Sequence, residues 1–463
     1  MILELAASRI LSPYFGNTNL AWTIIIGIIM ASMSLGYYVG GIIADKNQDV
    51  KMLSNLLVLA ALSISIIGIL EATALSWFAD SVNYIPAAFL ATTLVFALPS
   101  ALLAAVSPYI VKLANKQITD LGKVAGKISA LSTLGSITGT FLAGFVLLPF
   151  VGCRGTLAIL VITLFVMAFI LDGKNRILIK LGGVFLALLL LMLGSQLFER
   201  KYQNLLADID TQYTRIWILE DEDRFGDFRM IQSARGQESK IRKGSNDLAF
   251  NYLHYYDLFR AFDPEAKQVA MIGGAGLGYP RYFGEKYPEK SMTVIEIDPM
   301  MTRIATEMLG YQEQENVAIR HDDGRAFIRK HETIYDVIML DAFNGDTTPI
   351  HLVSKEALIE YRQKLSERGV LMINSTSGLT GDNSKDFQSI YATLQEVFPH
   401  TYVYKANLHA RYTASQNLMI VGSNQPVQKP DDMNLVAMLK TQTDQFSLSL
   451  PVLTDDKSAY ELY

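Results

Sequence analysis

Glycines and a carboxylate follow short apolar runs in the second half of the chain, at a spacing typical of nucleoside-binding folds. One apolar run leads into Gly274, Gly276 and Gly278, and the next apolar run ends in Glu296. A strand, a glycine-rich turn, a helix and a second strand that ends in an acid form the outline of such a unit. The third glycine of the dinucleotide fingerprint would fall at Tyr279. The spacing therefore favours S-adenosylmethionine, which has no pyrophosphate to be held at the helix N-terminus.

Two further acids stand at the ends of predicted strands. Asp323 lies beside Gly324 in "NVAIRHDDGRAFI", and Asp341 ends the apolar run of "YDVIMLDAF". Strands that alternate with helices form a mostly parallel sheet, and ligands bind at the carboxyl ends of its strands. We therefore expect Gly274, Glu296, Asp323 and Asp341 to share one site. The chemistry fits, because a carboxylate can remove the proton that keeps an ammonium group from attacking a sulfonium centre.

The composition excludes several kinds of site. The net charge of −5 gives no basic footprint for a nucleic acid. The single cysteine, Cys153, allows neither an internal disulfide nor a cluster of thiolate ligands. The histidines show no i, i+4 pair on a predicted helix. We therefore predict no metal site and no nucleic-acid partner.

The first half of the chain predicts a multi-pass transmembrane helical domain. A helix that crosses a bilayer requires about 20 apolar residues. The short N-terminal segment that carries Glu4 and Arg9 is predicted as a separate helix that does not span. We expect this domain at residues 1–199, as an anchor or as the holder of an amphiphilic substrate, and a second domain at residues 208–463. Six predicted spans contain no Lys, Arg, Asp or Glu: Leu20–Ala44, Met52–Ile69, Ile85–Val111, Ile128–Val151, Leu157–Leu171 and Leu181–Phe198.

The loops between the predicted spans give conflicting signals about orientation. Basic residues concentrate in three loops, which hold Lys46 and Lys51; Lys112, Lys116, Lys123 and Lys127; and Lys174, Arg176 and Lys180. The positive-inside rule places these loops in the cytoplasm, and six spans would then place the second domain outside. A cytosolic metabolite such as S-adenosylmethionine argues for the cytoplasmic side. We therefore predict a protein of the cell membrane and leave the side of its second domain open.

The second half predicts an α/β Rossmann-like domain of the type found in class I methyltransferases. The segments "YTRIWILED" and "DFRMIQSA" alternate as strands and predict a small β-hairpin region before it. A helix is expected around Asp247–Phe262 and another at Met300–Leu309. Later strands are expected at "YDVIMLDAF", "GVLMINST" and "NLMIVGSN".

The chain resembles the membrane-fused branch of the spermidine synthase (polyamine aminopropyltransferase) family. In the first half the resemblance rests on "LELAASRILSPYFGN" and "SLGYYVGGIIADK". In the second half it rests on "IGGAGLG", "VIEIDP", "DDGRAFI", "YDVIMLDAFNGDTTPIHLVSKEAL", "GVLMIN" and "LTDDKSAYEL". It implies a transferase of polyamine biosynthesis that uses S-adenosylmethionine or its decarboxylated form as donor and needs no metal. It also implies small-molecule substrates, release of methylthioadenosine and a homodimer.

The resemblance implies roles for residues at matching positions. Glu296 would accept hydrogen bonds from the ribose hydroxyls, and Asp323, beside Gly324, would receive the adenine amino group. Gly274 and Gly276 would let the backbone approach the nucleoside. In the family an aspartate at the position of Gly276 anchors the amine of the aminopropyl group, so this chain departs from the family there.

Asp341 matches the acid that deprotonates the attacking amine in this family. The candidate contacts to the substrate are Tyr252, Asn344, Asp346 and Asp455. The family has a second aspartate where this chain has Asn344, and a Tyr-His-Glu run where this chain has Tyr252 followed by Leu and His. The nucleoside half of the site is thus retained, whereas the polyamine half is only partly present.

Other interpretations stay open for single residues and for the activity. Asp323 could simply cap a helix, Tyr252 could belong to the core, and Asp455 could cap a turn. His254 and His351 are expected to be structural. Among activities, the main alternative is cyclisation of S-adenosylmethionine to azetidine-2-carboxylate, since a donor carboxylate meets less repulsion beside Gly276 than beside an acid. A methyltransferase or a non-catalytic membrane sensor would use the same nucleoside contacts.

Overall fold

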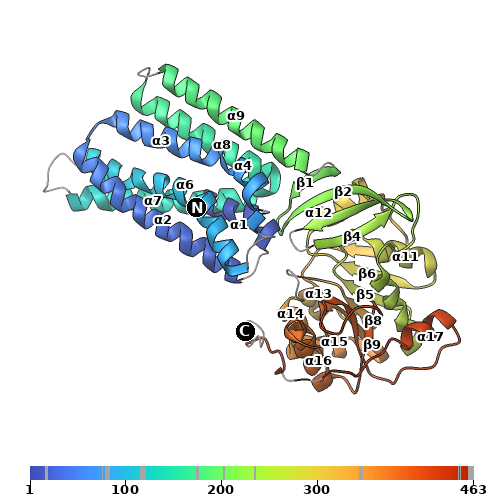
Figure 1. Ribbon diagram of the computed structural model, residues 1–463. Coiled ribbons are helices and arrows are strands. Elements are labelled where there is room, and N and C mark those ends of the chain that lie inside the picture. The colour runs from blue at the N-terminus through green and yellow to red at the C-terminus, as the bar shows by residue number, and fades with distance from the viewer. Residues whose placement is uncertain are drawn as a thin grey trace. The chain divides into compact units, whose positions relative to one another are not determined.

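The computed structural model describes residues 1–15, 19–75, 77–78, 84–114, 121–173, 177–201, 204–233, 236–343, 348–446, 448 and 450–456. The chain forms two compact units (Figure 1). The first comprises Met1–Ile218 with Ser233–Gly236, and the second comprises Leu219–Gln232 with Gln237–Tyr463.

The first unit is a bundle of helices. Its α-helices are α1 (Ile2–Phe15), α2 (Asn19–Lys46), α3 (Val50–Ser65), α4 (Ile67–Leu70), α6 (Tyr84–Ala114), α7 (Leu121–Leu142), α8 (Leu148–Asp172) and α9 (Ile177–Lys201). Within the described residues, five stretches are long and apolar enough to cross a membrane: Leu20–Lys46, Val50–Leu75, Ile85–Ala114, Gly122–Asp172 and Ile177–Phe198. Together these five stretches contain all six predicted spans.

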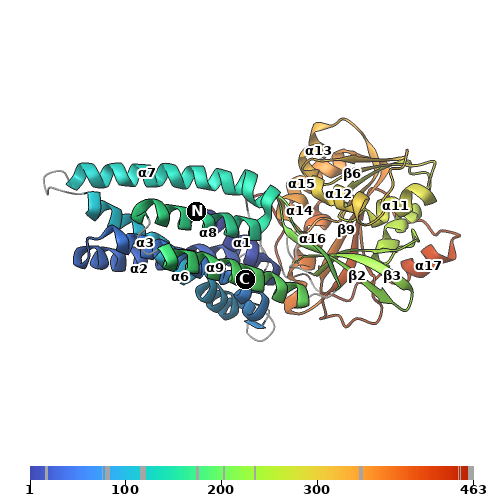
Figure 2. The same ribbon diagram turned by 90° about the horizontal axis from the view of Figure 1, so that it is seen from above.

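The fourth of these stretches has 51 residues and contains a break. A straight helix rises about 1.5 Å per residue, so this length would far exceed a hydrocarbon core of about 30 Å. Gly152, with φ 76° and ψ 173°, interrupts the helical backbone. This break lies near the start of α8, and α7 and the main part of α8 form separate rods (Figure 2). The sequence predicts two spans here, and the number of crossings stays a prediction.

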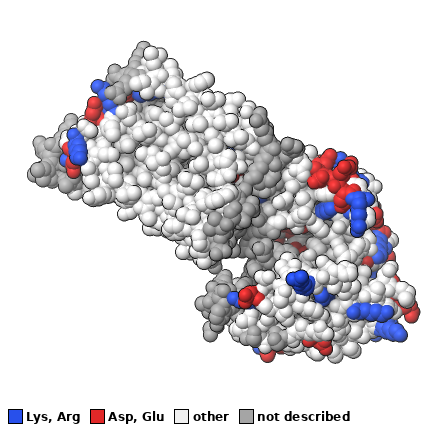
Figure 3. Space-filling view, viewed as in Figure 1, with Lys and Arg blue, Asp and Glu red and all other residues white. Residues whose placement is uncertain are grey.

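The exposed surface of the bundle is mostly apolar. Figure 3 shows the charged side chains of the helical unit gathered at one end of its visible face. Large apolar side chains such as Ile170 and Leu178 are exposed. An apolar surface of this extent requires an apolar environment or a partner.

Small residues allow α2 and α6 to pack closely. A Cβ built at Gly40 would lie 2.6 Å from the Cα of Ala105, and one at Gly36 would overlap the carbonyl oxygen of Ala101. Gly36 and Gly40 therefore let the two helices approach each other closely.

A buried ion cluster lies in the first unit. The Arg215 guanidinium donates to Glu71 Oε1 at 2.5 Å and to the two carboxylate oxygens of Asp208 at 2.8 and 2.7 Å. Arg154 lies 3.4 Å from Asp208. The side chains of Arg215 and Glu71 are only 1% and 2% exposed. Glu71 begins the π-helical turn η1 (Glu71–Leu75) inside the second apolar helix, and the predicted span ended before it.

The second unit is a doubly wound α/β domain. Its seven-stranded sheet has the order β10-β11-β9-β8-β5-β6-β7. The strands β5 to β9 are parallel, and β11 is antiparallel to both β9 and β10. The strands are β5 (Gln268–Ile272), β6 (Ser291–Ile295), β7 (Val317–Arg320), β8 (Tyr335–Leu340), β9 (Leu365–Ser377), β10 (His400–Lys405) and β11 (Gln416–Ser423).

A smaller sheet corresponds to the predicted β-hairpin region. It has the order β1-β2-β3-β4. The division between the two units falls within β2, after Ile218. The strands are β1 (Leu205–Asp210), β2 (Arg215–Asp223), β3 (Gly226–Ser233) and β4 (Gly236–Arg242).

Alternate side chains of a strand point to opposite faces of a sheet, and here both sets are apolar and buried. Helices therefore cover both faces of the large sheet. On one face Ile272 and Leu340 pack with α13 (Gly324–Lys330), α15 (Lys355–Gln363) and α16 (Lys385–Val397). On the other face Met271 and Met339 pack with the 3-10 helix η4 (Asn251–Leu258), α10 (Phe259–Phe262), α11 (Gly278–Lys286) and α12 (Pro299–Glu307). The Rossmann-like fold is confirmed, and the helix predicted around 247–262 is divided between η4 and α10.

The order of strands along the chain reverses beside β5, which has β6 on one side and β8 on the other. Open α/β sheets bind ligands at such a switch point, beyond the carboxyl ends of the strands. The last residues of β5, β6 and β8 are paired in register. Gly273, Glu296 and Asp341, which follow them, therefore begin at the same edge.

Candidate functional site

The glycine-rich turn is held by Glu296. Oε2 of this carboxylate accepts hydrogen bonds from the backbone N–H groups of Gly274 at 2.9 Å and Ala275 at 3.1 Å, and Oε1 accepts one from Asp298 N–H at 3.0 Å. Ala275 and Leu277 have positive φ values of 39° and 59°, which are unfavourable for residues with a Cβ. Burial raises the pKa of Glu296, and the backbone hydrogen bonds oppose this shift. Glu296 thus stabilises a strained turn.

Gly276 is required by packing. A Cβ at this position would overlap Oγ of Ser239 on β4 and would lie 2.8 Å from Cδ1 of Leu309. The side of Gly276 that lacks a side chain therefore faces other protein atoms, and contact of its backbone with a nucleoside stays a prediction. An acidic side chain could not be placed here without movement of Ser239.

Asp341 lies at the end of β8 and is bound by neutral donors. Its Oδ1 accepts a hydrogen bond from Nδ2 of Asn374 at 2.8 Å, and its Oδ2 accepts one from the hydroxyl of Tyr252 at 3.2 Å. Burial raises the pKa of Asp341 to about 6, although the hydrogen bonds from Asn374, Tyr252 and Tyr256 act against this shift. Such a carboxylate is ionised at neutral pH yet basic enough to accept a proton.

Two asparagines connect Asp341 to the next strands of the sheet. Asn417, on β11, donates from Nδ2 to Oδ1 of Asn374 at 3.2 Å, and Asn374 donates onward to Asp341. Because an ionised Asp341 only accepts, both amides must point their nitrogens toward it. Sequence reasoning missed both residues. The signal for Asn374 was a polar residue that ends the buried run "GVLMIN" beside the strand of Asp341.

Asp323 caps a helix. Its Oδ1 accepts a hydrogen bond from Ala326 N–H at 2.8 Å at the start of α13, and its Oδ2 lies 3.2 Å from Nε2 of His351. Its side chain is 34% exposed, so the capping role leaves it accessible. Gly324 lets α13 approach β5, because a Cβ there would overlap the side chain of Ile272. Contact of Asp323 and Gly324 with an adenine stays a prediction.

Asp455 is held by a different set of residues. Its two carboxylate oxygens accept hydrogen bonds from the guanidinium of Arg325 at 2.7 and 3.0 Å, and Ser354 Oγ donates at 2.6 Å. These contacts anchor the C-terminal segment, so the structure gives Asp455 a structural partner in place of the predicted substrate. The candidates Asn344 and Asp346 lie outside the described residues.

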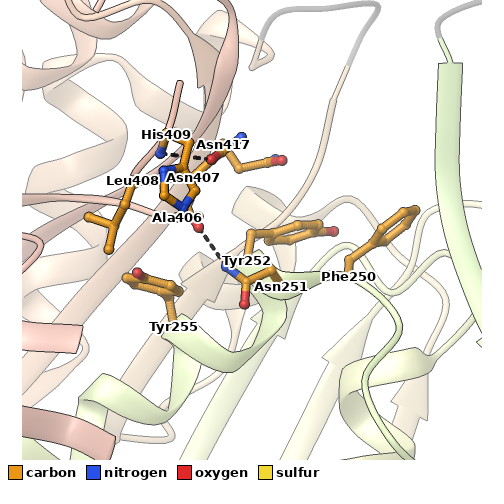
Figure 4. A pocket seen from close by; sticks show the side chains of 9 residues that line it. All are labelled: Phe250, Asn251, Tyr252, Tyr255, Ala406, Asn407, Leu408, His409 and Asn417. Carbon is orange, nitrogen blue, oxygen red and sulfur yellow. Dashed lines mark hydrogen bonds between the residues drawn. The ribbon is translucent and has the colours of Figure 1, made fainter. Parts of the chain in front are cut away.

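A pocket of about 490 Å³ opens beside the Asp341 network (Figure 4). One wall is formed by the segment around η4, and the other by the residues that follow β10 together with the start of β11. Asn251 joins the two walls by donating to the carbonyl oxygen of Ala406 at 2.5 Å. The lining residues are Phe250, Asn251, Tyr252, Tyr255, Ala406, Asn407, Leu408, His409 and Asn417.

The functional side chains follow the order of the strands along one edge of the sheet. Asp323 follows β7, Glu296 follows β6, and the glycine-rich turn follows β5. Asp341 comes next, after β8, and the pocket lies farther on, beside β11 and β10. The carboxylate of Asp341 thus lies between the glycine-rich turn and the pocket. Among the described residues, no group of three or more His, Cys, Asp or Glu side chains could hold a metal ion.

Fold and site together define a doubly wound domain of the kind that binds a nucleoside at its switch point. Residues 257–430 match the spermine/spermidine synthase domain. These residues form a domain of the spermine/spermidine synthase family, and the resemblance seen in the sequence is confirmed for this part of the chain.

Relatives named as aminopropyltransferases match part of the chain. The chain is 37% identical over 135 residues to the polyamine aminopropyltransferase of Vibrio vulnificus, over 28% of this chain and 45% of the relative. It is 32% identical over 147 residues to a probable polyamine aminopropyl transferase of Bifidobacterium longum, over 31% of this chain and 32% of the relative. The chain thus spans less than half of each of these two relatives.

A solved structure matches 49% of the chain. The chain superimposes on the structure of a probable spermidine synthase from Corynebacterium glutamicum with a TM-score of 0.43 and 24% sequence identity. The superposition covers 49% of this chain and 83% of that chain.

Proposed function

We propose that the protein is a membrane-bound transferase that cleaves the sulfonium of decarboxylated S-adenosylmethionine and transfers the aminopropyl group to an amine. The observation that carries this proposal is Asp341, a carboxylate with a pKa raised to about 6 and with neutral donors on both oxygens, placed between the glycine-rich turn and a pocket. A group of this kind suits the removal of a proton from an ammonium near neutral pH.

The reaction needs one proton acceptor and one leaving group. The acceptor's ammonium group gives a proton to Asp341, and the freed nitrogen lone pair attacks the aminopropyl carbon that is bonded to sulfur. The carbon–sulfur bond breaks, its electron pair stays on sulfur, and neutral methylthioadenosine leaves. Tyr252 supports the base, because burial and the adjacent Asp341 raise the pKa of its hydroxyl well above the usual value and keep it a donor.

The nucleoside would lie against the other half of the edge. Each carboxylate oxygen can accept two hydrogen bonds, and Oε1 of Glu296 accepts only one, from Asp298, so it retains capacity for one ribose hydroxyl. Asp323, partly exposed, has capacity for the adenine amino group in the same way. Gly274, with Glu296 close to its backbone, would form the floor beneath the sugar.

The five apolar helices support insertion of the first unit into a lipid bilayer. Because the donor is cytosolic, we propose that the second unit functions on the cytoplasmic side. A homodimer is proposed from the family resemblance alone.

A second candidate reaction is cyclisation of intact S-adenosylmethionine. It is favoured by Gly276, where packing against Ser239 excludes an acidic side chain that would repel the donor carboxylate. The α-amine would lose its proton to Asp341 and attack the carbon bonded to sulfur in the same molecule. Methylthioadenosine would leave, and azetidine-2-carboxylate would form with the benefit of proximity.

One experiment separates these reactions. Purified protein in detergent is incubated with S-adenosylmethionine or its decarboxylated form, each with and without an added amine, and products are identified by mass. Methylthioadenosine that requires the decarboxylated donor and an amine supports transfer. Methylthioadenosine from the intact donor without amine supports cyclisation. Adenosylhomocysteine, or no product from either donor, contradicts both.

A further inference from the structure

The pocket beside Asp341 has a neutral lining on the side where an acceptor amine would enter. Of the described residues that line it, none is Asp or Glu. Tyr252 and Asn417 both line the pocket and both belong to the hydrogen-bond network of Asp341. An amine in the pocket would therefore meet one carboxylate of this network, and that carboxylate is the proposed base.

The asparagine side chains present acceptors to an amine. Asn417 uses its Nδ2 to donate to Asn374 and Thr376, at 3.2 and 3.3 Å. Asn251 uses its Nδ2 to donate to Ala406. The amide oxygens of Asn417 and Asn251 therefore remain as the groups that can bind an N–H donor. These two oxygens suit one amino group that lies beside the hydrogen-bond network of Asp341.

A second ammonium group in the pocket would have no described acid to pair with. It would lose hydration without gaining a carboxylate from the described lining. Because an ammonium that leaves water without a partner of opposite charge is destabilised, the far end of a diamine is disfavoured in this pocket.

We propose that this pocket selects an acceptor with one amino group and an uncharged or anionic remainder, and that it discriminates against diamines and polyamines. The aromatic rings of Phe250, Tyr252 and Tyr255 would cover the apolar part of such an acceptor. Cation–π contacts with these rings would only partly offset the loss of hydration of a second ammonium group. The inference rests on the proposed transfer reaction and assigns its acceptor class.

The test uses three acceptors of equal carbon number that differ in charge at the far end: 1,4-diaminobutane, n-butylamine and 4-aminobutanoate. Full-length protein is supplied with decarboxylated S-adenosylmethionine, and kcat/KM is measured for each amine. We expect kcat/KM for 1,4-diaminobutane to be at least 10-fold below that of the better of the other two. Equal or better use of 1,4-diaminobutane would overturn the acceptor assignment while leaving the transfer reaction intact.

A binding measurement makes the test independent of turnover. Calorimetric titration of each amine into protein saturated with methylthioadenosine should give the same order of affinity. Tightest binding of 1,4-diaminobutane, or binding of none of the three, would overturn the inference. Absence of any product with any donor would instead contradict the proposed function, so the two failures are distinguishable.

A variant should reverse the preference. Asn407 lines the pocket, and its Oδ1 accepts from His409 N–H at 3.1 Å, a bond that an aspartate can also accept. Asn407→Asp supplies an anion with little change of shape. The ratio of kcat/KM for 1,4-diaminobutane over n-butylamine should rise about 10-fold or more. Asn434→Asp makes the same charge change at an exposed position of helix α17 (Met433–Leu439) and should leave the ratio unchanged. A ratio that is unchanged in Asn407→Asp would contradict the proposed role of the neutral lining.

Discussion

Two carboxylate sites in this molecule are buried in contrasting ways. In the first unit, Asp208 is bound by the cation of Arg215, and in the second unit, Asp341 is bound by an amide and a hydroxyl. Burial raises the pKa of both acids. At Asp208 the hydrogen bonds and charges of Arg215 and Arg154 outweigh it and lower the pKa, whereas at Asp341 burial prevails.

The difference shows what makes a buried acid available for chemistry. A carboxylate paired with a guanidinium has no tendency to take up a proton near neutral pH, so its role is structural. A carboxylate held by neutral donors keeps its orientation and stays basic. Substitutions at the two sites should therefore differ in whether activity or stability is lost.

Asp341→Asn should give the largest loss. General-base catalysis contributes about 100- to 10,000-fold, so kcat for methylthioadenosine release should fall within that range. The dissociation constant of methylthioadenosine, measured by calorimetry, serves as the control and should stay nearly constant. Retention of more than a tenth of the wild-type kcat would show that another group takes the proton.

Arg215→Met should damage stability more than activity. Removing one partner of a buried ion pair costs about 3–5 kcal/mol, because Glu71 would lose its cation and Asp208 would keep only Arg154. Thermal unfolding in detergent should show a large decrease in Tm. Arg303→Met removes the partner of an exposed pair with Glu307, whose side chains are 64% and 57% exposed, and should cost below about 1 kcal/mol. Similar decreases in Tm for the two variants would contradict the expected difference between the buried and the exposed ion pair.

Glu296→Ala should weaken nucleoside binding. Hydrogen bonds to a charged group contribute about 1.5–3 kcal/mol, and the glycine-rich turn also loses its anchor. Calorimetric titration with methylthioadenosine measures the change. An unchanged affinity would show that Glu296 does not bind the nucleoside.

Asn374→Ala should change the pH dependence. Activity requires ionised Asp341, so the rate should fall as the pH decreases through about 6. Asn374 donates to the ionised form and lowers the pKa, so its removal should move the midpoint of the pH–rate profile upward by about one unit. Asn434→Ala is the matched control. A downward shift would mean that the observed titration does not belong to Asp341.

The parts of the site that could be predicted from the sequence depend on local pattern. The turn at Gly274, Glu296 and Asp341 each follow an apolar run, and parallel strands bring such positions to one edge. Asn417 was missed because it begins an antiparallel strand, so the start of β11, and not its end, lies at the site. No local pattern marks that reversal of direction.

For the fold, as for the site, the features that could be predicted are those marked by local sequence pattern. Apolar runs identified the helices of the first unit and the strands of the second. Glu71 and Arg215 are 144 residues apart, so their pairing depends on tertiary packing. The contact between Gly276 and Ser239 has the same origin, since it joins two elements that no motif connects.

That contact also bears on how this chain can diverge further. Ser239 and Leu309 occupy the space that a side chain at position 276 would need, so an acid could enter the turn only if these two side chains moved. The effect of a substitution at position 276 therefore depends on the residues at positions 239 and 309, and the three positions are expected to be epistatic.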